Sequence, residues 1–444
     1  MNTRNKLYKK CRKLMLHAAR RFPTLRKVRY AYWRVQRRRF ASKTAHVHTD
    51  AHLVVFEAFG GRSYACSPKA IYEQMCADAR FDDWELCWSF QKKVMNRIEE
   101  EGRSCIGLNE RARIVMRGSK EYFDVFEHAK YWVQNNRVPE YVVPRDDQVY
   151  VQCWHGTPLK RLGFDVPEQG GGALNSAHEL AQRFAMDAEK WTYLLSPSAF
   201  TSEHLCDAFG LAPEKRAGVV IEEGYPRNDS IRATLDAPDA AERLAAMKER
   251  LGVPADKKLL LFAPTWRDDQ YEDGVGYTMD AIIDLDELQA RLGREWAVLL
   301  RMHYYIANKL DFSAWEGFVY DVSKADDINE LYCIADVLCT DYSSVFFDYA
   351  NTARPLVFYW PDREHYENDL HGFYIDADTL PGPKCATATQ LCDELDNIDS
   401  WQERYGTEYT AFCQTYCAKD DGHAAARVVE RVFGQPAAAH EQGA

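Results

Sequence analysis

Short apolar runs alternate along most of the chain with stretches whose apolar residues recur at helical spacing. Most of these runs are continuous rather than alternating with polar residues, which is typical of parallel strands buried on both faces. The pattern predicts strands at 53–56, 85–90, 113–116, 148–153, 193–195 and 218–221, and then at 259–263, 296–300, 318–320, 336–340 and 355–358. Strand–helix alternation over this length predicts an α/β fold built from doubly wound sheets.

A polar, Ala-rich segment between Ala233 and Lys258 separates these runs into two halves of similar size. We therefore expect two Rossmann-like domains, at 50–232 and 233–434, with a separate arm at 1–49 and a disordered tail at 435–444. The chain of 444 residues is 46% hydrophobic and 28% charged, which is ordinary for a folded globular protein. No apolar run approaches the ~18 residues that a membrane-spanning helix needs.

Charge is divided sharply along the chain. The formal net charge is −11, but residues 1–49 hold sixteen Lys or Arg and no Asp or Glu. The rest of the chain holds 40 basic and 67 acidic residues, a balance of −27. A basic arm before an acidic body indicates two separate tasks.

Apolar residues in the arm recur at helical spacing between the cations, with aromatic residues among them and a break at Pro23. This predicts two short basic amphipathic helices. Such helices lie on anionic membrane surfaces, and the interleaved Tyr30, Tyr32 and Trp33 favour that interpretation for residues 1–44. Two alternatives remain open: a helix that packs on the acidic body of its own chain, and a nucleic-acid arm. Nucleic acid is the least favoured partner, because no basic patch of comparable density follows in the body.

The thirteen cysteines include no Cys-x-x-Cys pair, and no His, Cys and Asp cluster has the spacing of a metal site. We expect no metal, no cofactor and free thiols in a reducing cytoplasm. Cys153 continues a strand and is interpreted as a buried small residue rather than a nucleophile.

Ligands of doubly wound sheets bind where the strands end, so the chemistry is expected in the loops that follow them. Trp154 to Lys160 follow the strand ending at Cys153, and in this loop His155 is a candidate general base. Gly156 and Thr157 offer donors to phosphate. The alternative for His155 is a structural role in a turn.

Four other segments carry candidate phosphate ligands. Pro264 and Thr265 follow the strand 259–263, and Arg301, Met302 and His303 follow the strand 296–300. Ser343 and Ser344 precede a helix, with Asp348 one turn further as a candidate acceptor for a substrate hydroxyl. Arg227 ends the first half and is placed to reach toward the site. The alternatives are helix caps for Thr265 and the serines, and an ion pair for Arg301.

Taken together, these segments resemble the CDP-glycerol glycerophosphotransferases, the teichoic acid primases and polymerases of bacterial cell-wall synthesis. The resemblance covers about Leu53 to Phe433 and rests on the order of its motifs: 56–64, 129–132, 152–160, 264–268, 301–303, 326–348 and 372–374. The chain has Tyr304 where the family usually has Pro, and His371 where it usually has Arg, which leaves the acceptor and the polyol open.

The resemblance implies a GT-B-like fold, with a CDP-activated polyol phosphate held mainly by the second domain. It implies transfer of glycerol phosphate from CDP-glycerol to a lipid-linked polyol-phosphate or glycan acceptor, with release of CMP, by a peripheral protein on the cytoplasmic face of the membrane. His155 and His303 become the catalytic candidates. The implied substrate-binding residues are Trp154, His155, Gly156, Thr157, Pro158, Arg227, Pro264, Thr265, Arg301, Met302, His303, Ser343, Ser344 and Asp348.

Three alternative functions stay open. CDP-ribitol shares the CDP end of CDP-glycerol, so the motifs do not separate the two donors. A GT-B glycosyltransferase would hold a nucleotide sugar with the same loops. A membrane-surface scaffold with a decayed site is disfavoured, because each motif position keeps a chemically competent side chain.

Overall fold

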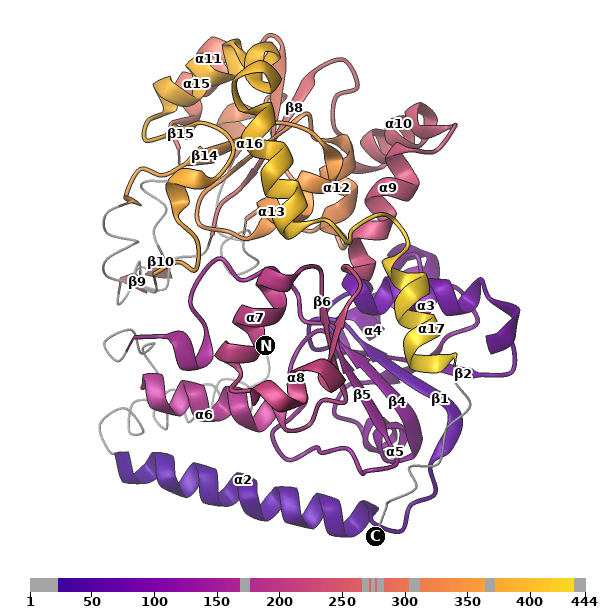
Figure 1. Ribbon diagram of the computed structural model, residues 1–444. Helices are drawn as coiled ribbons and strands as arrows, with labels where there is room; N and C mark the ends of the chain where they lie inside the picture. Colours follow the sequence, from indigo (N-terminus) through magenta and orange to yellow (C-terminus); the bar gives the residue numbers. More distant parts are fainter. Residues whose placement is uncertain are drawn as a thin grey trace.

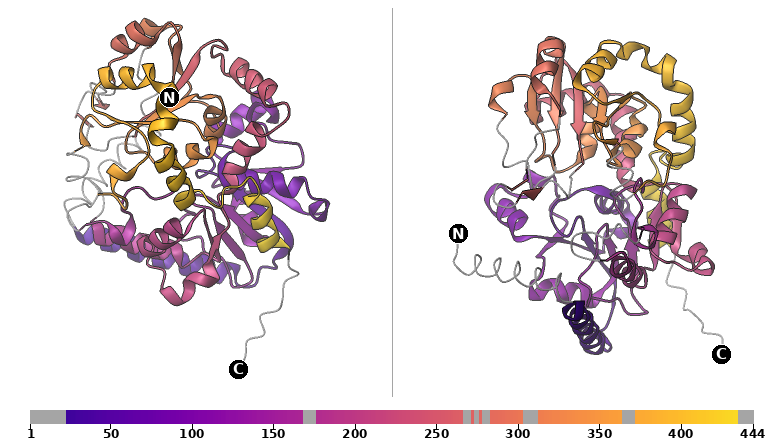
Figure 2. Two further views of the ribbon diagram at one scale, coloured as in Figure 1. Left: turned by 45° about the horizontal axis from the view of Figure 1, so that its top comes forward. Right: turned by 90° about the vertical axis from the view of Figure 1, so that its left-hand side faces the viewer.

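The computed structural model describes residues 23–167, 176–265, 271–272, 276–277, 283–302, 312–363 and 372–434, with the side chains of 23–30, 271–272 and 276–277 left aside. Two parallel sheets, each flanked by helices, lie one above the other in Figure 1, and Figure 2 shows the same two layers from other sides. The expected α/β class is confirmed. Of the sequence predictions, the first helix of the arm before Pro23, the tail 435–444, the segment 266–268 and the residues His303, Tyr304 and His371 lie outside the described residues.

The first sheet has seven strands in the order β3-β2-β1-β4-β5-β6-β7, and each neighbouring pair is parallel. Its strands are β1 (Asp50–Glu57), β2 (Glu85–Phe90), β3 (Arg113–Met116), β4 (Ala129–Gln134), β5 (Val149–Gln152), β6 (Tyr193–Ser196) and β7 (Val220–Glu222). The helices of this half are α3 (Cys66–Cys76), α4 (Lys92–Glu101), α5 (Lys120–His128), α6 (Ala177–Ala188), α7 (Ala199–Ala208), α8 (Pro213–Val219) and α9 (Asp229–Leu235).

The second sheet has six strands in the order β12-β11-β8-β13-β14-β15, again all parallel. They are β8 (Lys258–Ala263), β11 (Trp296–Leu300), β12 (Val319–Asp321), β13 (Val337–Thr340), β14 (Leu356–Tyr359) and β15 (Lys384–Cys385). A separate hairpin pairs β9 (Tyr271–Glu272) with β10 (Gly276–Tyr277). The helices are α10 (Ala240–Leu251), α11 (Leu285–Leu292), α12 (Ile328–Ile334), α13 (Val345–Tyr349), α15 (Ala388–Asp396) and α16 (Trp401–Tyr416).

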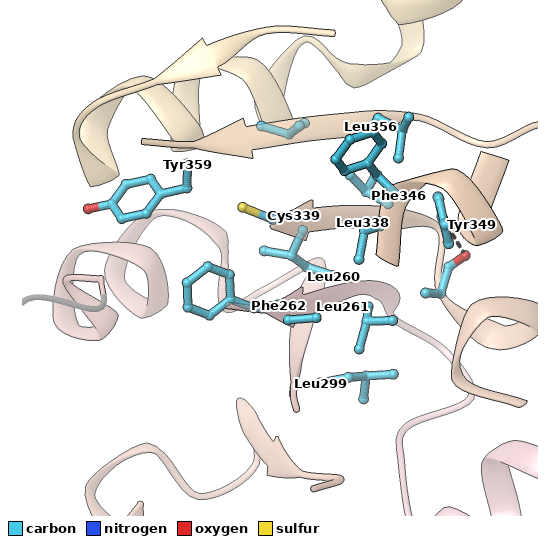
Figure 3. Close-up of a cluster of buried hydrophobic side chains, with 14 of the residues drawn as sticks. Leu260, Leu261, Phe262, Leu299, Leu338, Cys339, Phe346, Tyr349, Leu356 and Tyr359 are labelled. Carbon is cyan, nitrogen blue, oxygen red and sulfur yellow. Dashed lines mark hydrogen bonds between the residues drawn. The ribbon is translucent and has the colours of Figure 1, made fainter. Parts of the chain in front are cut away.

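Continuous apolar runs form the core of the second domain, as expected for strands covered on both faces. Figure 3 shows Leu261, Leu338 and Leu356 of adjacent strands beside Phe346 and Tyr349 of α13, all fully buried. Burying one such leucine contributes about 1.5–3 kcal/mol, so the sheet centre is strongly stabilised by burial. The carboxyl ends of its strands are thereby fixed in space.

The strand order places a reversal in each sheet, between β1 and β4 and between β8 and β13. At such a point the connections leave in opposite directions and open a crevice beyond the strand ends, where ligands of this fold class bind. Side chains bridge both reversals. The Phe59 N–H donates to Asn135 Oδ1 at 2.7 Å in the first sheet, and the Thr265 N–H donates to Asp341 Oδ1 at 2.6 Å in the second.

The last helix, α17 (Ala424–Phe433), returns to the first domain, although the expected second domain ran to residue 434. It packs beside α3, and in Figure 1 its yellow ribbon lies among indigo elements. Val428, Val429 and Phe433 are buried in the core beneath the first sheet. The apolar side of α17 is buried against the first domain. The chain therefore crosses between the two domains twice.

The described part of the arm is one helix, α2 (Pro23–Thr44), which runs along the first domain in Figure 1. It begins at Pro23, a residue tolerated in a first helical turn. Phe40 and Thr44 are buried against the body, and Lys43 and Arg37 pair with Glu127 and Glu189. The helix therefore packs on its own chain, which was one of the alternatives.

The opposite side of α2 faces outward. Tyr32 and Val35 keep 57% and 47% of their surfaces exposed, and Arg34, Arg38 and Arg39 are exposed around them. Within the described residues, no helix combines the length and apolarity that crossing a bilayer requires.

Candidate active site

The His155 loop leaves β5 through an unusual backbone conformation. Trp154 has φ 49°, in the left-handed region that costs a non-glycine residue on the order of 1 kcal/mol. Its N–H donates to Gln152 Oε1 at 2.9 Å, and its ring packs edge-on against Phe209 at 5.0 Å. The buried Trp154 thus anchors the turn, and the next residue, His155, is left with an open surface.

His155 is held in one tautomer. Its Nδ1 lies 2.9 Å from the backbone oxygen of Asn135. Because a carbonyl only accepts hydrogen bonds, Nδ1 carries the proton and Nε2 keeps its lone pair. The surrounding protein removes bulk water from the ring although part of its surface stays open, and this desolvation lowers the pKa to about 4, assisted by the charges of Arg227, Arg137 and Arg62. His155 is therefore a neutral base at physiological pH.

A glycine-containing loop after β1 forms the wall beside His155. Phe59, Gly60 and Gly61 have φ of 50°, 65° and 76° in succession, and the Phe59 ring lies edge-on to His155 at 6.2 Å. Gly61 is required here, because a Cβ would lie 3.0 Å from the Gln91 nitrogen in a strained conformation. This loop belongs to the motif 56–64 of the sequence.

Asn135 is a positioning residue that sequence reasoning missed. Its backbone oxygen orients His155, and its side-chain oxygen holds the Phe59 N–H. It directly follows β4, a strand that the apolar pattern did not predict because Lys130 and Gln134 interrupt the run. The motif 129–132 marked the segment without indicating the role of its neighbour.

The Ser343–Ser344 turn of the second domain meets the His155 loop. A Cβ on Gly156 would lie 2.9 Å from Ser344 Oγ, so the two loops are in contact across the domain boundary. Ser343 and Ser344 are half-buried, and the Ser344 side chain forms no capping hydrogen bond with α13. The turn therefore does not use Ser344 as the cap that sequence reasoning weighed as its alternative.

Arg301 and Met302 follow β11. The Arg301 guanidinium donates to the Ala325 oxygen at 3.0 Å and to the Val322 oxygen at 3.4 Å, and burial lowers its pKa. Among the described residues, no carboxylate forms an ion pair with it. The Met302 N–H donates to Ser323 Oγ at 2.8 Å. Arg301 is thus a half-buried cation held by neutral oxygens, which suits an anionic ligand.

Thr265 lies at the reversal of the second sheet, directly after Pro264. Its hydroxyl donates to Asp341 Oδ2 at 2.9 Å, in addition to the backbone bond to the same carboxylate. Asp341 thereby fixes the start of the loop after β8. Both Pro264 and Thr265 are half-buried at the carboxyl end of the sheet.

Arg227 and Asp348 pair with each other. Arg227 Nε and Nη2 donate to the two Asp348 oxygens at 3.1 and 2.9 Å, and both residues are buried. Asn228 adds a bond to Asp348 Oδ1 at 3.1 Å. Asp348 was expected to accept from a substrate hydroxyl; the structure instead places its carboxylate in a bidentate pair that joins the two halves of the chain.

The remaining candidates of the His155 motif are Gly156, Thr157 and Pro158. Thr157 and Pro158 are buried, and the Gly156 oxygen accepts from the Tyr225 hydroxyl at 3.3 Å. Cys153 is fully buried, and burial raises the pKa of its thiol, in keeping with a structural role. Among the described residues, no group of His, Cys, Asp or Glu is arranged to hold a metal ion.

One known protein family is similar to this chain over most of its length. A family model described as CDP-Glycerol:Poly(glycerophosphate) glycerophosphotransferase matches residues 39–434. The chain belongs to this family. The match spans both sheets and every candidate loop.

The named relatives are teichoic acid enzymes of Bacillus and Staphylococcus species. The chain is 38% identical over 381 residues to the teichoic acid poly(glycerol phosphate) polymerase of Bacillus subtilis (strain 168), covering 86% of this chain and 48% of that protein. It is 34% identical to the teichoic acid glycerol-phosphate transferase of Staphylococcus aureus (strain NCTC 8325 / PS 47), covering 86% of this chain and 93% of that protein. The chain thus spans about half the length of some relatives and nearly all of others.

Solved structures of the wall teichoic acid polymerase TagF superpose closely. One, with a histidine replaced by asparagine and soaked with CDPG, has a TM-score of 0.78 at 35% identity and covers 93% of this chain and 97% of that chain. The UDP-GlcNAc 2-epimerase of Neisseria meningitidis reaches a TM-score of 0.51 at 12% identity, covering 86% of this chain and all of that chain, which concerns the fold alone. The fold is GT-B-like, as expected.

Proposed function

We propose that the protein transfers glycerol phosphate from CDP-glycerol to a hydroxyl of a lipid-linked, teichoic-acid-like acceptor and releases CMP. The observation that carries this proposal is the neutral His155, whose Nε2 lone pair is set by the Asn135 oxygen, at a loop in contact with Ser344 of the other domain. A base on one side and phosphate donors on the other is the arrangement that phosphoryl transfer requires.

In the proposed reaction, the acceptor hydroxyl oxygen attacks the β-phosphorus of CDP-glycerol. His155 Nε2 takes the hydroxyl proton as the new P–O bond forms. The bond from the β-phosphorus to the bridging oxygen breaks, and its electron pair leaves with CMP. Only positioning and charge stabilisation are then needed from the rest of the site.

The second domain is proposed to hold the donor. Arg301 lacks a carboxylate partner among the described residues and supplies positive charge to the diphosphate, while Ser343 and Ser344 supply hydroxyl or N–H donors. Thr265, whose N–H and hydroxyl both donate to Asp341, positions the loop after β8 instead of binding the phosphate. His303, two residues after Arg301, is proposed to stabilise the leaving CMP. Arg227 and Asp348 support this site by fixing the boundary between the domains.

Glycerol is the favoured polyol. Relatives named for glycerol phosphate match at 34–38% identity over 84–86% of this chain. Relatives named for ribitol phosphate match at 27–31% over 64–66%. CDP-ribitol and a nucleotide sugar remain the alternative donors to be tested.

The proposed location is the cytoplasmic face of the membrane, where a lipid-linked acceptor is available. The exposed side of α2, with Tyr32, Val35 and several arginines, supports peripheral attachment to anionic lipid. No second anchor is required for this proposal, because the acceptor itself also tethers the enzyme during turnover.

The test is mass spectrometry of products formed on a synthetic lipid-linked acceptor. CDP-glycerol, CDP-ribitol, a UDP-sugar and a GDP-sugar are supplied separately, and release of CMP, UDP or GDP is followed in parallel. We expect a mass increase of one or more glycerol phosphate units with CDP-glycerol. Products from CDP-ribitol alone would change the polyol, and glycosylated products would overturn the reaction class.

A further inference from the structure

A charged cavity of about 310 Å³ lies in the first domain, apart from the loops described above. Its lining includes four cationic side chains and two carboxylates: Arg117, Arg137, Arg183, Lys190, Glu140 and Asp187. The volume is at the lower end of the ~300–1,000 Å³ that small-ligand sites occupy.

The ion pairs within the cavity lining do not neutralise all of its positive charge. Asp187 serves two cations, with Arg137 at 2.8 Å and Lys190 at 3.7 Å. Arg183 pairs with Glu140 at 3.2 Å, and its Nε is buried without a hydrogen-bond partner among the described residues. The cavity lining therefore carries two more positive than negative groups.

Arg117 has a further carboxylate behind it, Glu57, which is buried beneath the cavity lining. Its Nε donates to Glu57 Oε2 at 3.1 Å, and Glu57 is 1% exposed at the end of β1. Burial raises the pKa of Glu57, while the charge of Glu57 raises the pKa of Arg117 against the effect of its own burial. Even with Glu57 ionised, the group keeps one excess positive charge, and a partly buried excess charge is costly unless an anion compensates it.

Two contact paths link the cavity to His155. Arg117 lies beside Gly60, where a Cβ would be 3.8 Å from its Cζ, and the neighbouring Phe59 ring contacts His155. Arg137 stacks over the Phe184 ring at 4.3 Å, and Phe184 packs against Trp154, the residue before His155.

On its other side the cavity adjoins the membrane-facing arm. The Arg183 guanidinium lies 5.8 Å from the centre of the Trp33 ring of α2. Figure 1 shows α2 running parallel to α6, the helix that carries Arg183. The cavity thus lies between the helix proposed to contact lipid and the proposed base.

From this placement we infer that the cavity binds a phosphate group of the acceptor and holds the chain that carries the attacking hydroxyl. This inference rests on the proposed function and assigns the acceptor side of the same reaction. A phosphate is the anion that a fork of arginines recognises best, and every acceptor of the proposed class carries one.

The test uses two substitutions in the full chain, one that removes a positive charge from the cavity lining and one that removes a negative charge. With CDP-glycerol saturating, Arg183→Gln is expected to raise the acceptor KM roughly tenfold with kcat little changed. Glu140→Gln removes a negative charge from the same pair and is expected to lower the acceptor KM. A folding defect does not shift the acceptor KM in opposite directions in the two variants. The matched control is Arg113→Gln, which removes an arginine at the amino end of β3 that pairs with Glu85 and Glu121. An unchanged acceptor KM in both cavity variants would overturn the inference.

A second experiment distinguishes a phosphate of the acceptor from a phosphate of a lipid headgroup. A soluble glycerol phosphate oligomer and a vesicle-embedded acceptor are compared; an effect of Arg183→Gln on the vesicle acceptor alone would assign the cavity to a lipid headgroup and refute the acceptor assignment. Binding of the soluble oligomer is also measured by calorimetry with the donor site filled by CDP. If the wild-type protein binds the oligomer through Arg183 but transfers no glycerol phosphate, the proposed function fails while the cavity assignment stands.

Discussion

At the scale of single residues, His155 is set up as a base by its neighbours. A backbone oxygen fixes the tautomer, and desolvation, assisted by three arginines, disfavours the protonated ring. We expect His155→Ala to lower kcat by about 10²–10⁴-fold with little change in the donor KM, because the imidazole acts on the acceptor proton. CMP release under saturating donor measures this. His128→Ala, an exposed histidine at the end of α5, is the control, and near-full turnover by the His155 variant would refute the base assignment.

The pH profile gives an independent check of the same residue. His155 must be neutral to accept a proton, and its pKa is lowered from 6.5 to about 4. His155 is therefore protonated, and lost as a base, only as the pH falls through about 4. Its titration should lower kcat/KM for the acceptor at pH 5.5 by no more than about 10% of the plateau value. An ordinary histidine would leave about a tenth at that pH. Preincubation at pH 5.5 followed by assay at pH 7.5 controls for inactivation; a limb centred near 6.5 would contradict the structure.

Residue types at strand ends marked His155, Thr265, Arg301 and the serines as candidates, and the family resemblance combined them into one predicted site. Their partners were not predictable. Asn135 acts mainly through a backbone oxygen, which no residue type reveals, and the Arg227–Asp348 pair joins positions 121 residues apart. The first contact depends on the pairing of β4 with β5 and the second on how the two sheets meet, and local patterns specify neither.

At the scale of elements, the boundary between the domains is held by the buried pair of Arg227 and Asp348. Asp348→Ala leaves a buried, unpaired guanidinium, and we expect it to lower the free energy of unfolding by about 3–5 kcal/mol. The double variant Arg227→Met, Asp348→Leu should recover much of this loss, because no unpaired charge remains. Denaturant unfolding followed by tryptophan fluorescence measures both.

The exposed pair Arg243–Asp239 of α10 provides the matched comparison. Asp239→Ala is expected to leave the unfolding midpoint unchanged, since a solvated pair contributes little. If Asp348→Ala were as mild as Asp239→Ala and lost donor binding instead, Asp348 would be a ligand contact, as the sequence first indicated.

Strands were more predictable than helices. All eleven expected strands exist within a residue or two at most ends, because buried parallel strands need continuous apolar runs. Strand β4 was not predicted because Lys130 and Gln134 limit its apolar run. Gln134 lies at the polar, carboxyl end of the sheet, where it pairs with Glu57 of β1. Helix α17 packs its apolar side on the first domain, which the sequence did not indicate.

At the scale of the whole molecule, the division of charge takes on a spatial meaning. The inner side of α2 pairs Arg37 and Lys43 with carboxylates of the acidic body, and the outer side keeps its arginines in solvent. The arm is therefore both part of the fold and a basic surface. Removing the whole arm would also remove Phe40 and expose the core cluster that it packs against, so point substitutions test the surface more cleanly than a deletion.

The outward side of α2 is expected to bind anionic vesicles. Replacing Arg38 and Arg39 by Gln removes about 1 kcal/mol each of attraction to anionic lipid, or roughly thirtyfold in binding, and Tyr32→Ser with Val35→Ser removes the apolar contact as well. Sedimentation with anionic and neutral vesicles measures the loss. Arg243→Gln with Arg250→Gln removes the same charge from α10, where both side chains are solvent-exposed. Activity on a soluble acceptor should persist in every variant, because none touches the site; vesicle binding that survives the α2 substitutions would show that the membrane contact lies elsewhere.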